Sequence, residues 1–168
     1  QRVKKIVLDL KVFARAEQEE RTEADIKDIL ERTIMIVLKA IGRKVEVVRE
    51  YGAVPTVPCH AQRISQVFMN ILMNAAQVVP EDAGMVKVRT YCDEKYAYVD
   101  ITDNGPVIAE KDMARVFEPF FTTKPVGQGT GLGLSISYEI IKKHGGDIRV
   151  SSRLGEGTTL TVALLLAG

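Results

Sequence analysis

The chain has 168 residues, of which 46% are hydrophobic and 27% are charged; this is typical of one globular domain and excludes a collagen-like, low-complexity or disordered chain. A total of 23 Lys and Arg residues against 22 Asp and Glu leaves a net charge of +1. Because phosphate backbones select a large basic excess, no nucleic-acid partner is expected.

The first predicted element is an amphipathic helix from Arg2 to about Glu20, in which apolar side chains between Val3 and Ala14 recur at spacings of three and four. This helix either packs on its own domain or forms half of a helical hairpin that contacts another chain, and the segment alone leaves both open. Because the chain begins at Gln1 and has no signal peptide or membrane-length apolar stretch, we expect a piece of a longer protein.

The rest of the chain alternates between helical and strand-like patterns. Helices are predicted over residues 26–41 after capping residues at 22–25, over 60–79 before Pro80, over a short stretch within 109–117, and over 132–144. Strands are predicted over 45–50, 85–91, 96–102, 147–152 and 158–165, with loops at 55–58 and 118–131. This order predicts an α+β two-layer sandwich with helices on one face of a mixed, largely antiparallel sheet.

One face of the helix predicted over residues 60–79 is polar. Its members are Arg63, Gln66, Asn70, Asn74 and Gln77, at spacings of three and four. An asparagine oxygen can hold Mg²⁺ and its NH₂ group can hold a phosphate oxygen. The pattern fits a half-buried polar pocket or a plain solvated stripe, and the spacing alone does not decide between them.

Asp103 continues the apolar face of the strand predicted from Tyr96, because alternation places it in line with Val99 and Ile101. A buried carboxylate needs a partner. That partner is either an exocyclic amine of a ligand or the backbone of the adjoining Asn104-Gly105 turn.

Alternating glycines at 127, 129, 131 and 133 open directly onto the helix predicted from residue 132. Backbone amides at such a helix start suit a phosphate group, although a simple hinge has the same composition. The spacing matches neither GxGxxG nor a Walker loop.

Taken in order, these segments resemble the catalytic ATP-binding half of a sensor histidine kinase. The corresponding motifs are the asparagine box at 66–76, the first glycine box at 103–106, the F box at 117–124, the second glycine box at 129–134 and the closing segment at 155–160. The resemblance implies a Bergerat-type fold. It also implies that residues 1–21 are the second helix of a dimerisation hairpin, whose acceptor-histidine helix is missing, and that residues 22–168 are the ATP-binding domain.

The same resemblance implies roles for individual residues. Asp103 would accept a hydrogen bond from the adenine amino group, helped through water by Thr158. Asn74 would ligate Mg²⁺, and Asn70 and Gln77 would contact the phosphates. Residues 104–130 would form a lid anchored by Phe120 and Phe121. Further ATP-binding positions are Gly105, Val107, Thr123, Lys124, Gly129, Thr130, Gly131, Leu132, Gly133 and Leu134.

The implied function is transfer of the γ-phosphoryl group of Mg-ATP to a histidine outside this chain, for relay to a response-regulator aspartate. The parent would be a homodimer with this part in the cytoplasm. Asn70 stands where gyrase-like and chaperone-like ATPases have a catalytic glutamate, which disfavours hydrolysis because an amide is no general base. A nucleotide-sensing pseudokinase and a serine kinase of the same fold are the alternatives.

Other residues are expected to be outside the chemistry. His60 and His144 lack the sequence context of an acceptor histidine, so we expect structural or exposed roles for both. Cys59 and Cys92 form no CxxC motif and are expected to be packing residues in a reducing compartment. Val107 departs from the family, which usually has glycine there, and the valine is expected to weaken nucleotide binding.

Overall fold

The computed structural model describes residues 21–119, 121 and 133–166, so the helix predicted from Arg2 to about Glu20 lies outside the described part. The described strands are β1 Thr22–Ala24, β2 Glu46–Tyr51, β3 Val57–Cys59, β4 Met85–Cys92, β5 Tyr96–Asp103, β6 Asp147–Arg153 and β7 Gly157–Leu165. The described helices are α2 Ile26–Ile41, α3 Ala61–Val78, α4 Glu110–Met113 and α5 Gly133–Lys143.

A five-stranded sheet in the order β2-β4-β5-β7-β6 forms one layer. β2 runs parallel to β4, and every other neighbouring pair is antiparallel. The mixed, largely antiparallel sheet predicted from the sequence is therefore confirmed. β1 and β3 pair separately with each other. The loop predicted over residues 55–58 is therefore wrong at residues 57 and 58, and of the predicted capping residues 22–25 Asp25 caps α2 whereas residues 22–24 form a strand.

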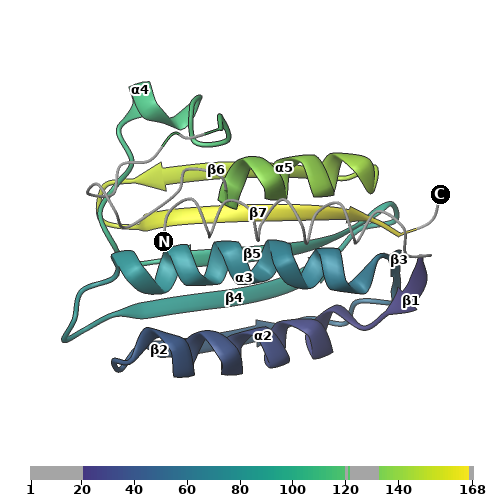
Figure 1. Cartoon of the computed structure of the whole chain (residues 1–168), viewed down its shortest axis with the longest axis horizontal. Coiled ribbons are helices and arrows are strands. Elements are labelled where there is room, and N and C mark those ends of the chain that lie inside the picture. Colours follow the sequence, from purple (N-terminus) through teal and green to yellow (C-terminus); the bar gives the residue numbers. More distant parts are fainter. Residues whose placement is uncertain (1–20, 120, 122–132, 167–168) are drawn as a thin grey trace.

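Helices α2, α3 and α5 lie side by side over one face of the sheet (Figure 1). Apolar side chains from both layers meet between them and form one core, because each helix and each strand has one apolar face. The largest fully buried side chains are Leu30, Ile34, Ile64, Phe68, Ile71, Ile101, Ile140, Ile141 and Leu164. The predicted two-layer α+β sandwich is thus confirmed.

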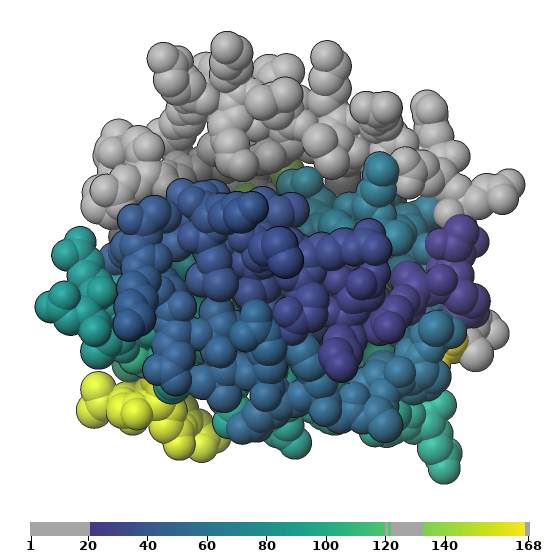
Figure 2. Space-filling view, turned by 90° about the horizontal axis from the view of Figure 1, so that it is seen from below, coloured from purple at the N-terminus to yellow at the C-terminus, as the bar shows by residue number. Residues whose placement is uncertain are grey.

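Helix α2 begins and ends as the sequence predicts. The side chain of Asp25 accepts hydrogen bonds from the backbone N–H groups of Lys27 and Asp28, and Gly42 ends the helix with a φ of 69°. Figure 2 views this edge of the molecule, where α2 and β2 reach the surface. Met35 and Ile36 are exposed on the outer side of α2.

Helix α3 has a different kind of ending, because no glycine follows it. The guanidinium group of Arg43 reaches from the α2–β2 connection and donates hydrogen bonds to the carbonyl oxygens of Ala76, Gln77 and Val79, at 2.7, 3.0 and 3.2 Å. A cation at a helix C-terminus satisfies these carbonyl groups and opposes the helix dipole. Arg43 therefore fixes the end of the helix that carries the predicted asparagines.

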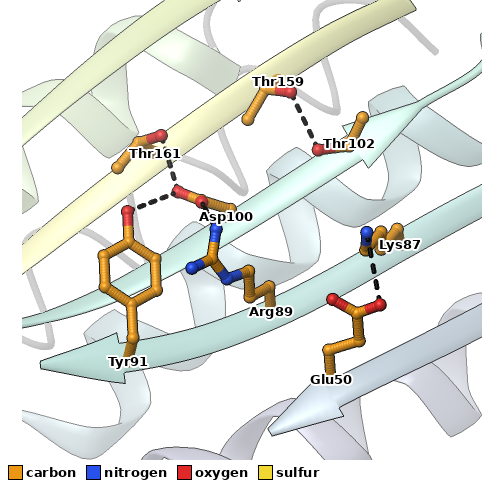
Figure 3. Close-up of polar contacts among 8 residues, drawn as sticks. All are labelled: Glu50, Lys87, Arg89, Tyr91, Asp100, Thr102, Thr159 and Thr161. Carbon is orange, nitrogen blue, oxygen red and sulfur yellow. Dashed lines mark hydrogen bonds and ion pairs between the residues drawn. The ribbon is translucent and has the colours of Figure 1, made fainter. Parts of the chain in front are cut away.

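The second face of the sheet carries polar side chains that contact one another across the strands (Figure 3). Asp100 accepts hydrogen bonds from Tyr91 at 3.3 Å and from Thr161 at 2.7 Å. The Oγ1 atoms of Thr102 and Thr159 are 2.8 Å apart, which is the cross-strand pairing typical of a solvated sheet face.

None of the described helices combines the length and apolarity needed to cross a lipid bilayer.

Candidate functional site

Asp103 lies at the end of β5 with only 8% of its surface exposed, on the side of the sheet that faces the helices. Its Oδ1 accepts a hydrogen bond from the backbone N–H of Gly105 at 2.9 Å. Burial raises the pKa of the Asp103 carboxyl, and the Gly105 bond opposes that rise. Among the described residues, the Gly105 N–H is the one group that donates to this carboxyl, and no described group donates to Oδ2.

Of the two partners that the sequence leaves open for Asp103, the structure shows the backbone of the adjoining turn, and the ligand amine stays a prediction. The side chain bonds its own turn, as an ordinary turn aspartate does. It is also buried among apolar neighbours with one oxygen left over, which an ordinary turn aspartate is not. A donor from a bound molecule would complete its hydrogen bonding.

Gly105 brings the turn after β5 against the end of α3. A Cβ atom at this position would lie 2.7 Å from the carbonyl oxygen of Val78 and 3.1 Å from Oδ1 of Asp103. A side chain would therefore push the turn away from the helix. The glycine of the first predicted box thus couples Asp103 to α3.

Thr158 faces Asp103 directly across the β5–β7 pair and is 6% exposed. The adjacent Gly157 has a φ of 77°, and a Cβ atom there would overlap the carbonyl oxygen of Asp103. The structure therefore brings together Asp103, Gly105 and Thr158, which the sequence predicted as one group.

The polar face of α3 is not a plain solvated stripe. Arg63 is 2% exposed, Gln66, Asn70 and Asn74 are half-buried, and Gln77 alone is exposed. This graded burial favours the half-buried pocket over the surface stripe.

Asn70 connects α3 to the start of α5. Its Nδ2 donates to the carbonyl oxygen of Gly133 at 3.1 Å and approaches Oγ of Ser137 at 3.4 Å. Ser137 Oγ itself donates to the same carbonyl oxygen at 2.8 Å. The end of the predicted second glycine box therefore meets the asparagine helix in the folded chain.

Some of the remaining predicted site residues are described by the structure, and the others lie outside the described part. Leu134 packs against the core, and the side chain of Val107 is 40% exposed. Phe117, the first residue of the predicted F box, packs on Tyr138 of α5 with ring centroids 5.4 Å apart. The residues that lie outside the described part are Phe120, Thr123, Lys124, Gly129, Thr130, Gly131 and Leu132.

The described residues contain no group of three or more His, Cys, Asp and Glu side chains placed to hold a metal ion. Asn74 is half-buried on the polar face of α3 and carries an amide oxygen, which is a type of ligand that Mg²⁺ accepts.

His144 is a structural residue, as predicted. It is 3% exposed, its Nδ1 lies 2.8 Å from the carbonyl oxygen of Ile140, and its Nε2 accepts a hydrogen bond from the backbone N–H of His60 at 3.1 Å. Burial lowers its pKa to about 4. Cys59 is buried in the core as expected, whereas Cys92 is exposed, so the packing role predicted for Cys92 is wrong.

Ser152 on β6 belongs to none of the predicted motifs, yet it hydrogen-bonds both Thr158 and the turn that follows Asp103. Asp103 was identified as a polar residue on the apolar face of its strand, and Ser152 shows the same pattern. Alternation along β6 places Ser152 in line with Ile148 and Val150, so it is a polar side chain on an inward-facing position.

Comparison with known proteins gives one family and a consistent set of relatives. The family model described as "Histidine kinase-, DNA gyrase B-, and HSP90-like ATPase" matches residues 59–168. The sensor kinase CckA of Brucella abortus (strain 2308) is 32% identical over 97% of this chain and 19% of its own length. The signal transduction histidine-protein kinase AtoS of Escherichia coli (strain K12) is 35% identical over 96% of this chain and 27% of its own length.

Solved structures show the same fold. The nucleotide-free catalytic domain of histidine kinase ThkA superposes with a TM-score of 0.79 at 30% identity, covering 88% of this chain and 97% of the domain. A mycobacterial sensor histidine kinase, MprB, has a TM-score of 0.75 at 30% identity, covering 86% of this chain and 97% of that structure. The chain therefore matches nearly all of these two structures but no more than 27% of the two sensor kinases above.

Proposed function

This chain belongs to the histidine kinase-, DNA gyrase B- and HSP90-like ATPase family, and we propose that it binds Mg-ATP and transfers the γ-phosphoryl group to a histidine outside residues 1–168. The acceptor would lie on a dimerisation helix of the same parent protein. The phosphoryl group would then pass to an aspartate of a response-regulator receiver domain.

The observation that carries the proposal is the buried carboxylate of Asp103. Its Oδ1 is occupied by Gly105, which leaves Oδ2 for a donor, and Thr158 stands opposite on the next strand. The exocyclic amine of adenine is such a donor, and the Thr158 hydroxyl can bond a neighbouring ring nitrogen through water. The adenine end of ATP would therefore lie between the end of β5 and the end of α3.

Helix α3 would guide the rest of the nucleotide. Gly105 contacts Val78 at one end of the proposed site, and Asn70 contacts Gly133 at the other. Position 78 is eight residues after position 70, which corresponds to about 12 Å along a helix. That length suits an adenosine with its phosphate chain laid along the helix. Asn74 lies midway and would hold Mg²⁺, with Asn70 on the phosphates. Gln77, which the resemblance also assigns to the phosphates, is next to Val78 and therefore lies at the adenine end of this arrangement.

The residues at the phosphate end favour transfer over hydrolysis. Asn70 cannot accept a proton from an attacking water as a carboxylate does, and its amide already bonds Gly133. Bound Mg²⁺ would neutralise the charge on the phosphate oxygens. The contribution of this chain would be positioning: Asp103 fixes the base, and the polar face of α3 fixes the phosphates.

The domain assignment forms part of the same proposal. Residues 1–21 would be the second helix of the dimerisation hairpin and residues 22–168 the ATP-binding domain. The parent would be a homodimer with this part in the cytoplasm. The lid predicted over residues 104–130, with Phe120, Thr123, Lys124 and the second glycine box, stays a prediction.

The direct test adds a separate polypeptide that carries both helices of the parent's dimerisation hairpin. With γ-labelled ATP and Mg²⁺, we expect label on the hairpin in an acid-labile, base-stable form, and none on this chain alone. Replacing the hairpin's acceptor histidine with glutamine is the matched control and should abolish labelling. ATP binding without labelling would favour a nucleotide sensor, and acid-stable label would favour a serine kinase; either result contradicts the proposal. Label on His60 or His144 would contradict it as well.

A further inference from the structure

Three polar side chains form one row across neighbouring strands at the end of the sheet. Asp103 on β5 is directly opposite Thr158 on β7, and Thr158 is directly opposite Ser152 on β6. Directly opposite residues point to the same side of a sheet, so all three face the helix layer. Most other side chains buried on this side of the sheet are apolar, although Thr90 on β4 is a further buried hydroxyl.

Ser152 is the most connected member of the row. Its Oγ accepts a hydrogen bond from the backbone N–H of Ile108 at 2.8 Å and lies 2.8 Å from Oγ1 of Thr158. Its bond to the carbonyl oxygen of Gly157 is long, at 3.4 Å. The short contacts therefore connect β6 both to Thr158 and to the segment that follows Asp103.

The contact with Ile108 fixes the far end of the turn at Asp103. The near end is held by the bond from the N–H of Gly105 to Asp103. Thr158 adds a long contact to the carbonyl oxygen of Pro106 at 3.5 Å. Residues 105–108 are thus tied at both ends to side chains of one row, two of which the proposed function assigns to adenine.

A hydroxyl group has one proton to donate, so only one of the Ser152 and Thr158 hydroxyl groups can donate to the other. If Ser152 donates to Thr158, the Thr158 proton is left for Pro106 or for a bound molecule. If Thr158 donates to Ser152, its oxygen presents only lone pairs. In both cases the contact of 2.8 Å fixes where Thr158 Oγ1 lies beside Asp103.

We propose that Ser152 is a positioning residue for adenine recognition: it holds Thr158 and the 105–108 turn in the arrangement in which Asp103 and Thr158 meet the base. This inference rests on the proposed function, because it concerns the same nucleotide site. Ser152 itself need not touch the nucleotide.

The test compares Ser152→Ala with Ser152→Thr, which keeps the hydroxyl group. Ser151→Ala is the matched control, because Ser151 is exposed and lies on the opposite face of the same strand. Two measurements are made on each chain: amide hydrogen exchange at Ile108 without nucleotide, and binding of ATP and GTP by calorimetry.

We expect Ser152→Ala to speed exchange at Ile108 by about tenfold or more and to weaken ATP binding by about tenfold, as loss of one buried hydrogen-bond partner does. GTP binding should change little, because GTP does not use the Asp103 contact, so the ATP-to-GTP preference should fall by the same factor. Ser152→Thr and Ser151→Ala should resemble the wild type.

Equal weakening of ATP and GTP, or failure of Ser152→Thr to restore the preference, would make Ser152 merely structural and overturn the inference. Unchanged ATP affinity in Ser152→Ala would overturn it too, while leaving the proposed function intact. A wild-type chain that binds no ATP would instead overturn the proposed function, and the positioning role with it.

Discussion

The backbone of Gly157 packs directly against the carbonyl oxygen of Asp103, in a left-handed conformation with a φ of 77°. No side chain fits between the two strands at this point. The glycine therefore sets how closely β7 approaches the residue on which the proposed adenine site depends.

We expect Gly157→Ala to destabilise the fold and also to impair ATP binding, because the new Cβ must displace Asp103. Gly155 in the same turn provides a matched control: its φ is 82°, but a Cβ there would meet nothing within 4 Å. Gly155→Ala should cost only the left-handed strain, about 1–2 kcal/mol in the free energy of unfolding. Thermal melting and ATP titration of both variants distinguish the backbone strain, which both substitutions cause, from displacement of Asp103, which only Gly157→Ala causes. Equal effects of the two substitutions would contradict the close contact.

The departure at Val107 gives the second prediction. If the valine fills part of the pocket or strains the turn, Val107→Gly should tighten ATP binding by about tenfold, which equals ~1.4 kcal/mol. It should also lower the melting temperature slightly, because glycine has more freedom in the unfolded chain. Calorimetry and melting without nucleotide measure the two effects independently. Unchanged or weaker ATP binding would show that the exposed valine is accommodated without cost.

The buried His144 gives a pH dependence. Its pKa is about 4 in the folded chain, below the ordinary value of 6.5 that applies after unfolding. Between these values the unfolded state holds a proton that the folded state lacks, so this histidine's contribution to stability is present above pH 6.5 and is lost as the pH falls toward 4. The slope is at most about 1.4 kcal/mol per pH unit.

The check is the free energy of unfolding in denaturant across this pH range, for the wild type and for His144→Gln. Glutamine does not titrate, so the variant should show a flatter dependence on pH. Parallel curves for the two proteins would mean that other groups cause the acid sensitivity.

Asn74 gives a prediction about the metal. We expect Asn74→Ala to reduce the increase in ATP affinity that Mg²⁺ produces, and to leave the fold intact because the residue lies on the half-buried face of α3 rather than in the core. Gln62, exposed on the first turn of α3, is the control position. Titrations with and without Mg²⁺ measure the effect. An unchanged Mg²⁺ dependence would mean that Asn74 is not a ligand.

Much of the fold could be predicted because its signals are local. The cap at Asp25, the stop at Gly42 and the alternation along β5 each lie within a few residues of the feature they determine. β1 and β3 escaped prediction because each has three residues. Such short strands carry no readable period, and they are stabilised by pairing with each other and by burial of Ala24, Val57 and Cys59 in the core.

The site residues also differ in whether their signal is local in the sequence or depends on long-range contacts. Asp103 was identifiable because a charged residue on an apolar face contradicts its own strand pattern. Ser152 carries the same signal more weakly, since a serine is common on half-buried strands. Its role depends on contacts with Ile108, 44 residues away, and with Thr158, and sequence spacing does not encode such contacts. The end cap that Arg43 provides for α3 is another long-range contact of this kind.

The most direct test of the adenine site is calorimetric titration of the wild type and Asp103→Asn with ATP and with GTP. The wild type should prefer ATP by at least ~10²-fold, because Asp103 accepts from the adenine amine where guanine presents another acceptor. Asp103→Asn should lose this preference, with ATP binding weakened by about tenfold or more. It should melt no lower than the wild type, since the amide still accepts from Gly105 and removes a buried charge. Equal affinity of the wild type for ATP and GTP, or full ATP affinity in Asp103→Asn, would contradict the assignment.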